Sequence, residues 1–110
     1  MNSKKYEMIF CIVNAGFAVE AMEAAKKAGA KGGTILRARG TANPEAEEFF
    51  NISIQPDKEI LWLIVPKEIK DDVMHRLYQD AGLNSQSKGI AFSLPVTHAV
   101  GLHEEDEEAK

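Results

Sequence analysis

The segment from Ile60 to Val65 most constrains what this chain can fold into, because every one of its residues is apolar. Successive side chains of a strand point to opposite faces of the sheet, so this segment presents apolar groups on both faces. Residues 8–13 are apolar throughout in the same way. Neither segment has the spacing of an amphipathic helix, and we predict strands over residues 6–13 and 59–65.

Two other stretches have helical periodicity, since small and apolar residues recur in them about every four positions. These positions are Phe17, Ala21, Ala25 and Ala28 in the first stretch, and Ile69, Val73, Leu77 and Ala81 in the second. Gly29 and Gly82 are expected to end the two helices. Asp71 and Asp72 are expected in the first turn of the second helix, where acids complement the helix dipole.

Further strands are expected over residues 34–39, 49–54 and 90–94, with the last one cut by Pro95 and an exposed loop over residues 40–48. The predicted order is strand, helix, strand, loop, strand, strand, helix, strand. Two strand–helix–strand units favour an α+β, ferredoxin-like split βαβ fold, in which an antiparallel sheet carries both helices on one face. Residues 1–103 are expected to form this domain, and residues 104–110 an acidic and disordered tail.

Two helices can cover only one face of such a sheet, yet the central strands are apolar on both. A chain of 110 residues has little left to cover the second face. We therefore expect the chain to oligomerise through its open sheet face. The alternative is that its own C-terminal segment covers that face.

Charge and composition exclude several classes of protein. The net charge is −4, but five of the seventeen acids lie in residues 104–108, and the remaining twelve are balanced by thirteen bases. The body therefore has no basic excess for nucleic-acid binding. No apolar run reaches the about 18 residues of a membrane span, and residues 1–5 do not begin a recognisable secretory signal. Cys11 is the single cysteine, so no internal disulfide is possible, and we expect a cytoplasmic protein.

No motif in the sequence identifies a catalytic or binding site by itself. The glycine-rich stretch 29–34 lacks the Gly-Lys-Ser/Thr ending of a phosphate loop and is better explained as a helix end and turn. The loop 85–89 offers hydroxyls, a lysine and a glycine that could approach an anion. His75, His98 and His103 have no tight ligand spacing. Cys11 lies in a buried-looking strand, and no nucleophile–base pair can be named, so we do not expect an enzyme.

Three stretches together resemble the P-II family of nitrogen-regulatory signalling proteins. They are residues 28–40 with the sequence AGAKGGTILRARG, residues 60–66 with ILWLIVP, and residues 88–96 with KGIAFSLPV. The likeness spans most of the chain. It implies a ferredoxin-like subunit, a homotrimer, and a non-enzymatic regulator of a target protein, with nitrogen metabolism as the regulated process.

The resemblance also implies a small ligand bound between subunits, an adenine nucleotide such as ATP, ADP or AMP. The ligand-binding residues that it implies are Gly33, Thr34, Gly40, Ile64, Ser87, Lys88, Gly89 and His103. A loop that docks onto the target protein is implied as well. Its residues here are Thr41, Asn43, Pro44, Glu45, Glu47 and Glu48, and this loop is shorter than the family's and has no tyrosine.

The sequence departs from the family where phosphates are held. Ile90 stands at the position of the family's phosphate-loop lysine, and Gly101 and His103 stand at the positions of its two C-terminal arginines. The position of the family's glutamine that is used for 2-oxoglutarate falls near Pro44 in this sequence. Trp62 stands where the family has an acid in the central strand. Charge-assisted hydrogen bonds are the main interactions that hold a triphosphate. Because the three cationic residues of the family are replaced here, we expect weakened ATP binding. The alternative function is a trimeric divalent-metal-binding protein of the same architecture, suggested by the histidines and the acidic tail.

Overall fold

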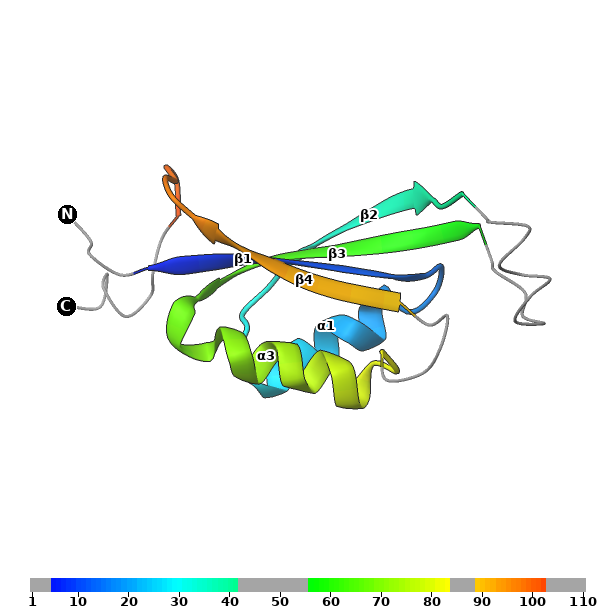
Figure 1. The fold of residues 1–110 in the computed structure, drawn as a ribbon, viewed down its shortest axis with the longest axis horizontal. Helices are drawn as coiled ribbons and strands as arrows, with labels where there is room; N and C mark the ends of the chain where they lie inside the picture. The colour runs from blue at the N-terminus through cyan, green and yellow to red at the C-terminus, as the bar shows by residue number, and fades with distance from the viewer. Residues whose placement is uncertain (1–4, 42–55, 84–88, 103–110) are drawn as a thin grey trace.

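The computed structural model describes residues 5–41, 56–83 and 89–102. Within them the chain forms one four-stranded antiparallel sheet and two helices. The elements in chain order are β1 (Tyr6–Asn14), α1 (Ala18–Lys27), β2 (Thr34–Arg39), β3 (Asp57–Pro66), α3 (Lys67–Asp80) and β4 (Gly89–Val96). The strand order is β2-β3-β1-β4, and both helices lie on the same side of the sheet (Figure 1). The predicted ferredoxin-like architecture is therefore confirmed.

The predicted strands agree closely with the observed ones, and β2 spans the predicted residues 34–39. The expectations for the end of β4 and the start of α3 were wrong. Strand β4 continues through Pro95 to Val96, which an edge strand tolerates because it has a hydrogen-bonded neighbour on one side only. Helix α3 begins at Lys67, directly after β3, so Glu68 is the acid of its first turn and Asp71 and Asp72 lie in the second. The strand predicted over residues 49–54 lies outside the described residues.

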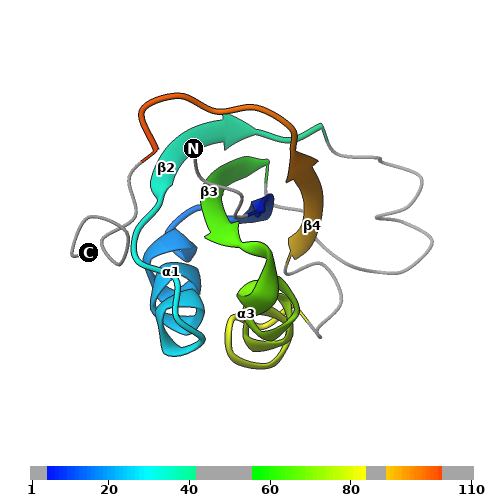
Figure 2. The same cartoon turned by 90° about the vertical axis from the view of Figure 1, so that its left-hand side faces the viewer.

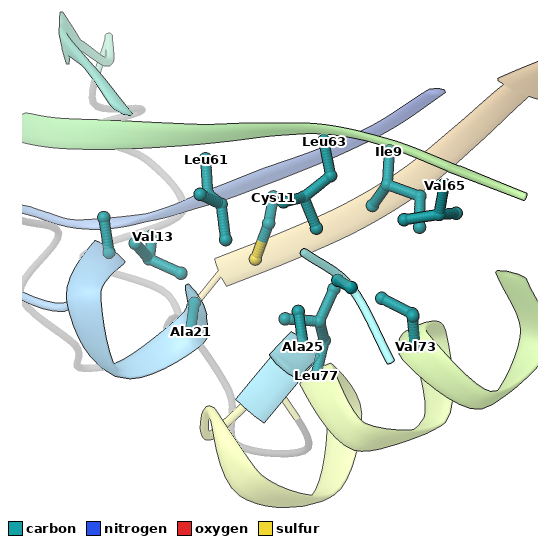
Figure 3. Packing of buried hydrophobic residues seen from close by; sticks show 12 residues of the cluster. Ile9, Cys11, Val13, Ala21, Ala25, Leu61, Leu63, Val65, Val73 and Leu77 are labelled. Carbon is teal, nitrogen blue, oxygen red and sulfur yellow. The ribbon is translucent and has the colours of Figure 1, made fainter. Parts of the chain in front are cut away.

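The core forms between the sheet and the helices, because every second residue of the two central strands points toward α1 and α3. In β1 these residues include Ile9, Cys11 and Val13, and in β3 they are Leu61, Leu63 and Val65 (Figure 3). The helices contribute alanines from α1, including Ala21 and Ala25, and the larger Val73 and Leu77 from α3. Phe17, which the helical spacing put on the buried face of α1, instead precedes that helix and is 44% exposed. Among the described parts of the chain, no helix is long and apolar enough to cross a membrane.

Helix α1 is capped by a side chain from a distant strand. Phe17 at its N-cap position has no side chain that can accept a hydrogen bond, and no local cap forms. Instead the backbone N–H of Ala18 donates to Oε1 of Glu59 at 3.0 Å. Next to it, Nζ of Lys58 donates to Oδ1 of Asn14 at 2.7 Å. Two residues of β3 therefore hold the β1–α1 turn against the sheet.

Removing this cap should destabilise the protein. We expect Glu59→Ala to lower the free energy of unfolding by about 1 kcal/mol, because one N–H at the start of α1 loses its acceptor. Glu59→Gln keeps a side-chain oxygen at the same reach and should lose less. Urea unfolding followed by circular dichroism measures both values. Equal losses for the two variants would show that the charge of Glu59, and not its hydrogen bond, stabilises the helix.

Candidate ligand site on the open sheet face

The sheet face away from the helices is apolar and largely uncovered. Aromatic residues from three strands lie side by side on it, because Phe10 of β1 is in register with Trp62 of β3 and with Phe92 of β4. The ring centroids of Phe10 and Trp62 are 5.0 Å apart, and those of Phe10 and Phe92 are 5.4 Å apart, with both pairs stacked. Further exposed apolar side chains surround this row, namely Leu36, Ile64, Ile90 and Leu94. The expectation that two helices leave one apolar face open is confirmed.

The segment after β4 crosses this side of the sheet from the β4 edge to the β2 edge (Figure 2). Figure 2 shows the segment after β4 passing over β2, on the side of the sheet away from the helices. Leu102 contributes to the surface there. Trp62 nevertheless remains 38% exposed and Phe92 40% exposed. The described part of the C-terminal segment therefore leaves these two rings of the open face partly exposed.

A pocket of about 500 Å³ lies where Leu102 meets strands β2 and β3. Its lining residues are Gly32, Gly33, Thr34, Leu36, Trp62, Ile64 and Leu102. Three of the residues implied by the family resemblance, Gly33, Thr34 and Ile64, therefore come together in one pocket. None of the seven lining residues is charged, so the polar groups that they offer are the Thr34 hydroxyl, the indole N–H of Trp62 and backbone atoms.

The other predicted ligand residues do not join this pocket within one chain. Gly40 follows the far end of β2, where its N–H donates to the carbonyl oxygen of Pro56 at 2.7 Å. Gly89 begins β4, which β1 and β3 separate from β2. Ser87, Lys88 and His103 lie outside the described residues. Of the predicted docking loop, Thr41 is described and exposed, whereas Asn43, Pro44, Glu45, Glu47 and Glu48 lie outside the described residues.

Four residues that line the pocket were absent from the predicted site, namely Gly32, Leu36, Trp62 and Leu102. The sequence carried a signal for Trp62, since it replaces a family acid in a strand that is apolar on both faces. Leu36 and Leu102 had no such signal. Leu36 looks like an ordinary strand residue, and the placement of Leu102 depends on the path of the chain after β4.

The two neighbouring glycines of the pocket differ in the space around them. A Cβ on Gly33 would collide with the side chain of Leu63 and lie 3.1 Å from the carbonyl oxygen of Trp62. A Cβ on Gly32 would meet nothing within 4 Å. A larger residue at position 33 would therefore force Leu63 or the chain entering β2 to shift, independently of any ligand.

This contrast gives a matched pair of variants. We expect Gly33→Ala to lower the free energy of unfolding by about 1–3 kcal/mol, since the extra methyl group overpacks the β2–β3 contact. Gly32→Ala should leave stability unchanged or raise it slightly, because the substitution also restricts the unfolded chain. Thermal unfolding of both ligand-free variants checks this. A loss of the same size at Gly32 would contradict the packing explanation.

The other candidate groups among the described residues lie apart from this pocket. Burial raises the pKa of the Cys11 thiol to about 11, so the reactive thiolate is suppressed. His75 and His98 are exposed, and the described residues hold no group of three metal-ligating side chains. A hollow of about 470 Å³ between α1 and α3 has mixed charge, with Lys27, Asp72 and Arg76 in its wall. Arg76 there already donates to Asp80 at 3.0 Å.

Comparisons with known proteins agree on the fold. No family model matches the sequence, and no curated protein matches it significantly. Among solved structures, a protein assigned to PII-like signalling from Thermus thermophilus has a TM-score of 0.63 at 23% identity, with 87% of this chain and 90% of that chain covered. PII from Arabidopsis thaliana bound to citrate has a TM-score of 0.63 at 22% identity, covering 84% and 78%.

The apo form of CPII from Thiomonas intermedia, described as a nitrogen regulatory PII-like protein, has a TM-score of 0.59 at 14% identity, covering 84% of this chain and 89% of that chain. All three similarities extend over most of both chains, and all three proteins carry a PII or PII-like name. The chain therefore has the fold of the PII and PII-like signalling proteins.

Proposed function

We propose that this chain is a PII-like signal-transduction protein, which binds an adenine nucleotide between the subunits of a homotrimer and regulates a partner protein. The observation that carries the proposal is the open apolar face with a ligand-sized pocket at its edge, on a fold shared with PII and PII-like proteins. Nitrogen metabolism is the process that we propose for this regulation, and the cytoplasm is its proposed place. The family resemblance alone supports these two points.

The apolar face supports the homotrimer. Exposed apolar patches of this kind mark surfaces at which proteins associate. The row formed by Phe92, Phe10 and Trp62 crosses three strands, so a partner could cover it only by lying flat on the sheet. Further copies of the same chain have equally apolar faces, so they could cover the row without a different protein.

The positions of the predicted ligand residues support a site between subunits. Thr34 and Ile64 lie in the pocket on the β2 side of the sheet, whereas Gly89 begins β4 at the opposite edge. Within one chain, the residues at these two edges cannot contact the same small molecule. The β4 edge of a neighbouring subunit could bring its residues 87–89 to the pocket and complete the site.

Signalling would require the ligand to favour one state of the chain. Gly40 lies between β2 and the predicted docking loop, and its hydrogen bond to Pro56 joins the described residues on either side of residues 42–55. A ligand on β2 and β3 could change how well residues 41–48 hold a single conformation. Their degree of conformational order would then set the affinity for the partner. The ligand can do so only if it binds the two states with different affinity.

Isothermal titration calorimetry with ATP, ADP, AMP and cyclic AMP tests the nucleotide part of the proposal. We expect saturable binding of at least one of the four compounds by the wild-type protein, and weaker binding by Ile64→Ala, which removes part of the pocket wall. Val19→Ala is the control, because Val19 is exposed on α1, outside the pocket. No heat from any of the four compounds would refute nucleotide binding.

A further inference from the structure

The connection between α1 and β2 is rich in bases. Residues 24–44 contain no aspartate or glutamate and five basic residues, namely Lys26, Lys27, Lys31, Arg37 and Arg39. The two arginines lie on β2 and have acids opposite them, since Arg37 is in register with Glu59 of β3. Arg39 is in register with Asp57 in the same way. The three lysines lie before β2, and all are exposed. We call Lys26, Lys27 and Lys31 the lysine cluster.

The lysine cluster carries more positive charge than the acids beside it balance. Glu23 precedes Lys27 by four residues on α1, so the two side chains share one face of the helix. Asp72 of α3 lines the same hollow as Lys27. Arg76 adds a further base to that hollow, and it donates to Asp80. Three lysines therefore face these two acids, and the surface can still accept carboxylates.

The described chain ends beside this cluster. Leu102 is its last residue, and Leu102 lines a pocket together with Gly32, which directly follows Lys31. Five consecutive acids begin two residues later, at positions 104–108. An extended residue spans at most about 3.6 Å, so residues 103–108 can reach about 20 Å from Leu102. The acidic tail therefore begins next to the lysine cluster and is long enough to cross it.

The segment that leads to the tail is held by few apolar contacts. Residues 97–102 are exposed throughout, and Val100 is 86% exposed. The segment nevertheless crosses the sheet from β4 to β2 (Figure 2). Burial of apolar surface contributes little to this path, so a contact beyond Leu102 would be needed to hold the segment in place.

We propose that residues 104–108 dock on the lysine cluster of the same chain and thereby hold the segment after β4 across the sheet. Single exposed ion pairs contribute little stability each. Here the tail is tethered beside its site, and a short tether gives an effective concentration in the millimolar range. The tail is then a salt-sensitive latch, and not the freely disordered end that its composition alone predicts. This contact does not depend on the function proposed above.

A nitroxide spin label near the end of the tail tests the contact, because it broadens the NMR signals of nearby backbone amides. Ala109→Cys supplies a reactive thiol without changing a charge. Burial raises the pKa of the Cys11 thiol to about 11, which suppresses its reaction with the label. The reference chain has the same label and an uncharged tail, so it is tethered at the same place but cannot dock through charge. Its substitutions are Glu104→Gln, Glu105→Gln, Asp106→Asn, Glu107→Gln and Glu108→Gln.

At an ionic strength of about 0.01 M, we expect the acidic tail to broaden the amides of residues 26–31 at least about twofold more than the reference tail does. This excess should disappear at about 1 M, because the Debye length falls from roughly 30 Å to about 3 Å. Lys27→Gln combined with Lys31→Gln should also remove it. Arg37→Gln combined with Arg39→Gln is the matched control, since it removes two bases from the same acid-free run, and it should keep the excess. Circular dichroism should show all variants folded.

The proposal fails if the acidic and reference tails broaden these amides equally at low ionic strength. It also fails if the two double variants lose the excess to the same extent, because net charge and not the lysine cluster would then attract the tail. Spin-labelled chains can be mixed with isotope-labelled chains that carry no spin label. Broadening of residues 26–31 in that mixture would place the tail on a neighbouring subunit and overturn docking within one chain. None of these measurements involves a nucleotide, so failure here leaves the proposed function standing.

Discussion

The substitution Phe92→Asp is expected to convert the assembled protein into folded monomers. Phe92 lies on the edge strand β4 and is 40% exposed in the single chain, so an aspartate there would be solvated in the monomer. In a trimer packed through the open face the same carboxylate would be buried among apolar side chains. Burying an unpaired charge costs several kcal/mol after relaxation, and a symmetric trimer would contain three of them.

Light scattering coupled to size-exclusion chromatography measures the molar mass directly. We expect a trimer for the wild-type protein and a monomer for Phe92→Asp, with circular dichroism spectra of the same shape. Val19→Asp is the control, since Val19 is 62% exposed on the helical side of the molecule. It should remain trimeric. A trimeric Phe92→Asp would exclude the open face as the interface, and a monomeric wild-type protein would refute the homotrimer itself.

The sequence predicted the layers of this fold well, because they depend on local patterns. Strands at 6–13 and 59–65 could be recognised from apolar runs, and the open face followed from the shortage of chain to cover it. The error at Pro95 had a tertiary cause. The sequence alone could not show that Pro95 lies on an edge strand, where a missing N–H costs little, since strand order is a tertiary property.

The site was harder to predict than the fold, because it depends on register. Trp62 and Thr34 are distant in the sequence, and they become neighbours only through the pairing of β3 with β2. The family resemblance named Thr34 and Ile64 without indicating that Trp62 would stand between the pocket and Phe10. It also named Gly33 for the ligand, although the close approach of Leu63 already explains that glycine. A glycine that the resemblance assigns to the ligand can thus serve packing, binding or both, and only variants tested without ligand separate these roles.

Gly89 presents the same question with a larger expected effect. The resemblance assigns Gly89 to ligand binding, but a Cβ there would collide with the carbonyl oxygen of Ile12 and lie 2.9 Å from Cδ2 of Leu83. Strand β1 lies between β3 and β4, so the backbone at Ile12 is held from both sides and cannot move away easily. The start of β4 would have to shift instead, and the β1–β4 pairing would weaken.

We therefore expect Gly89→Ala to lower the free energy of unfolding of the ligand-free protein by about 1–3 kcal/mol or more. For a domain of this size the melting temperature should fall by roughly 4 °C for each kcal/mol. Gly32→Ala is the appropriate control, because it restricts the unfolded chain to the same extent and meets no neighbour in the folded one. Thermal unfolding without ligand compares the two variants. If Gly89→Ala melts with the wild-type protein and only nucleotide binding is lost, the glycine is required for the ligand and not for the sheet.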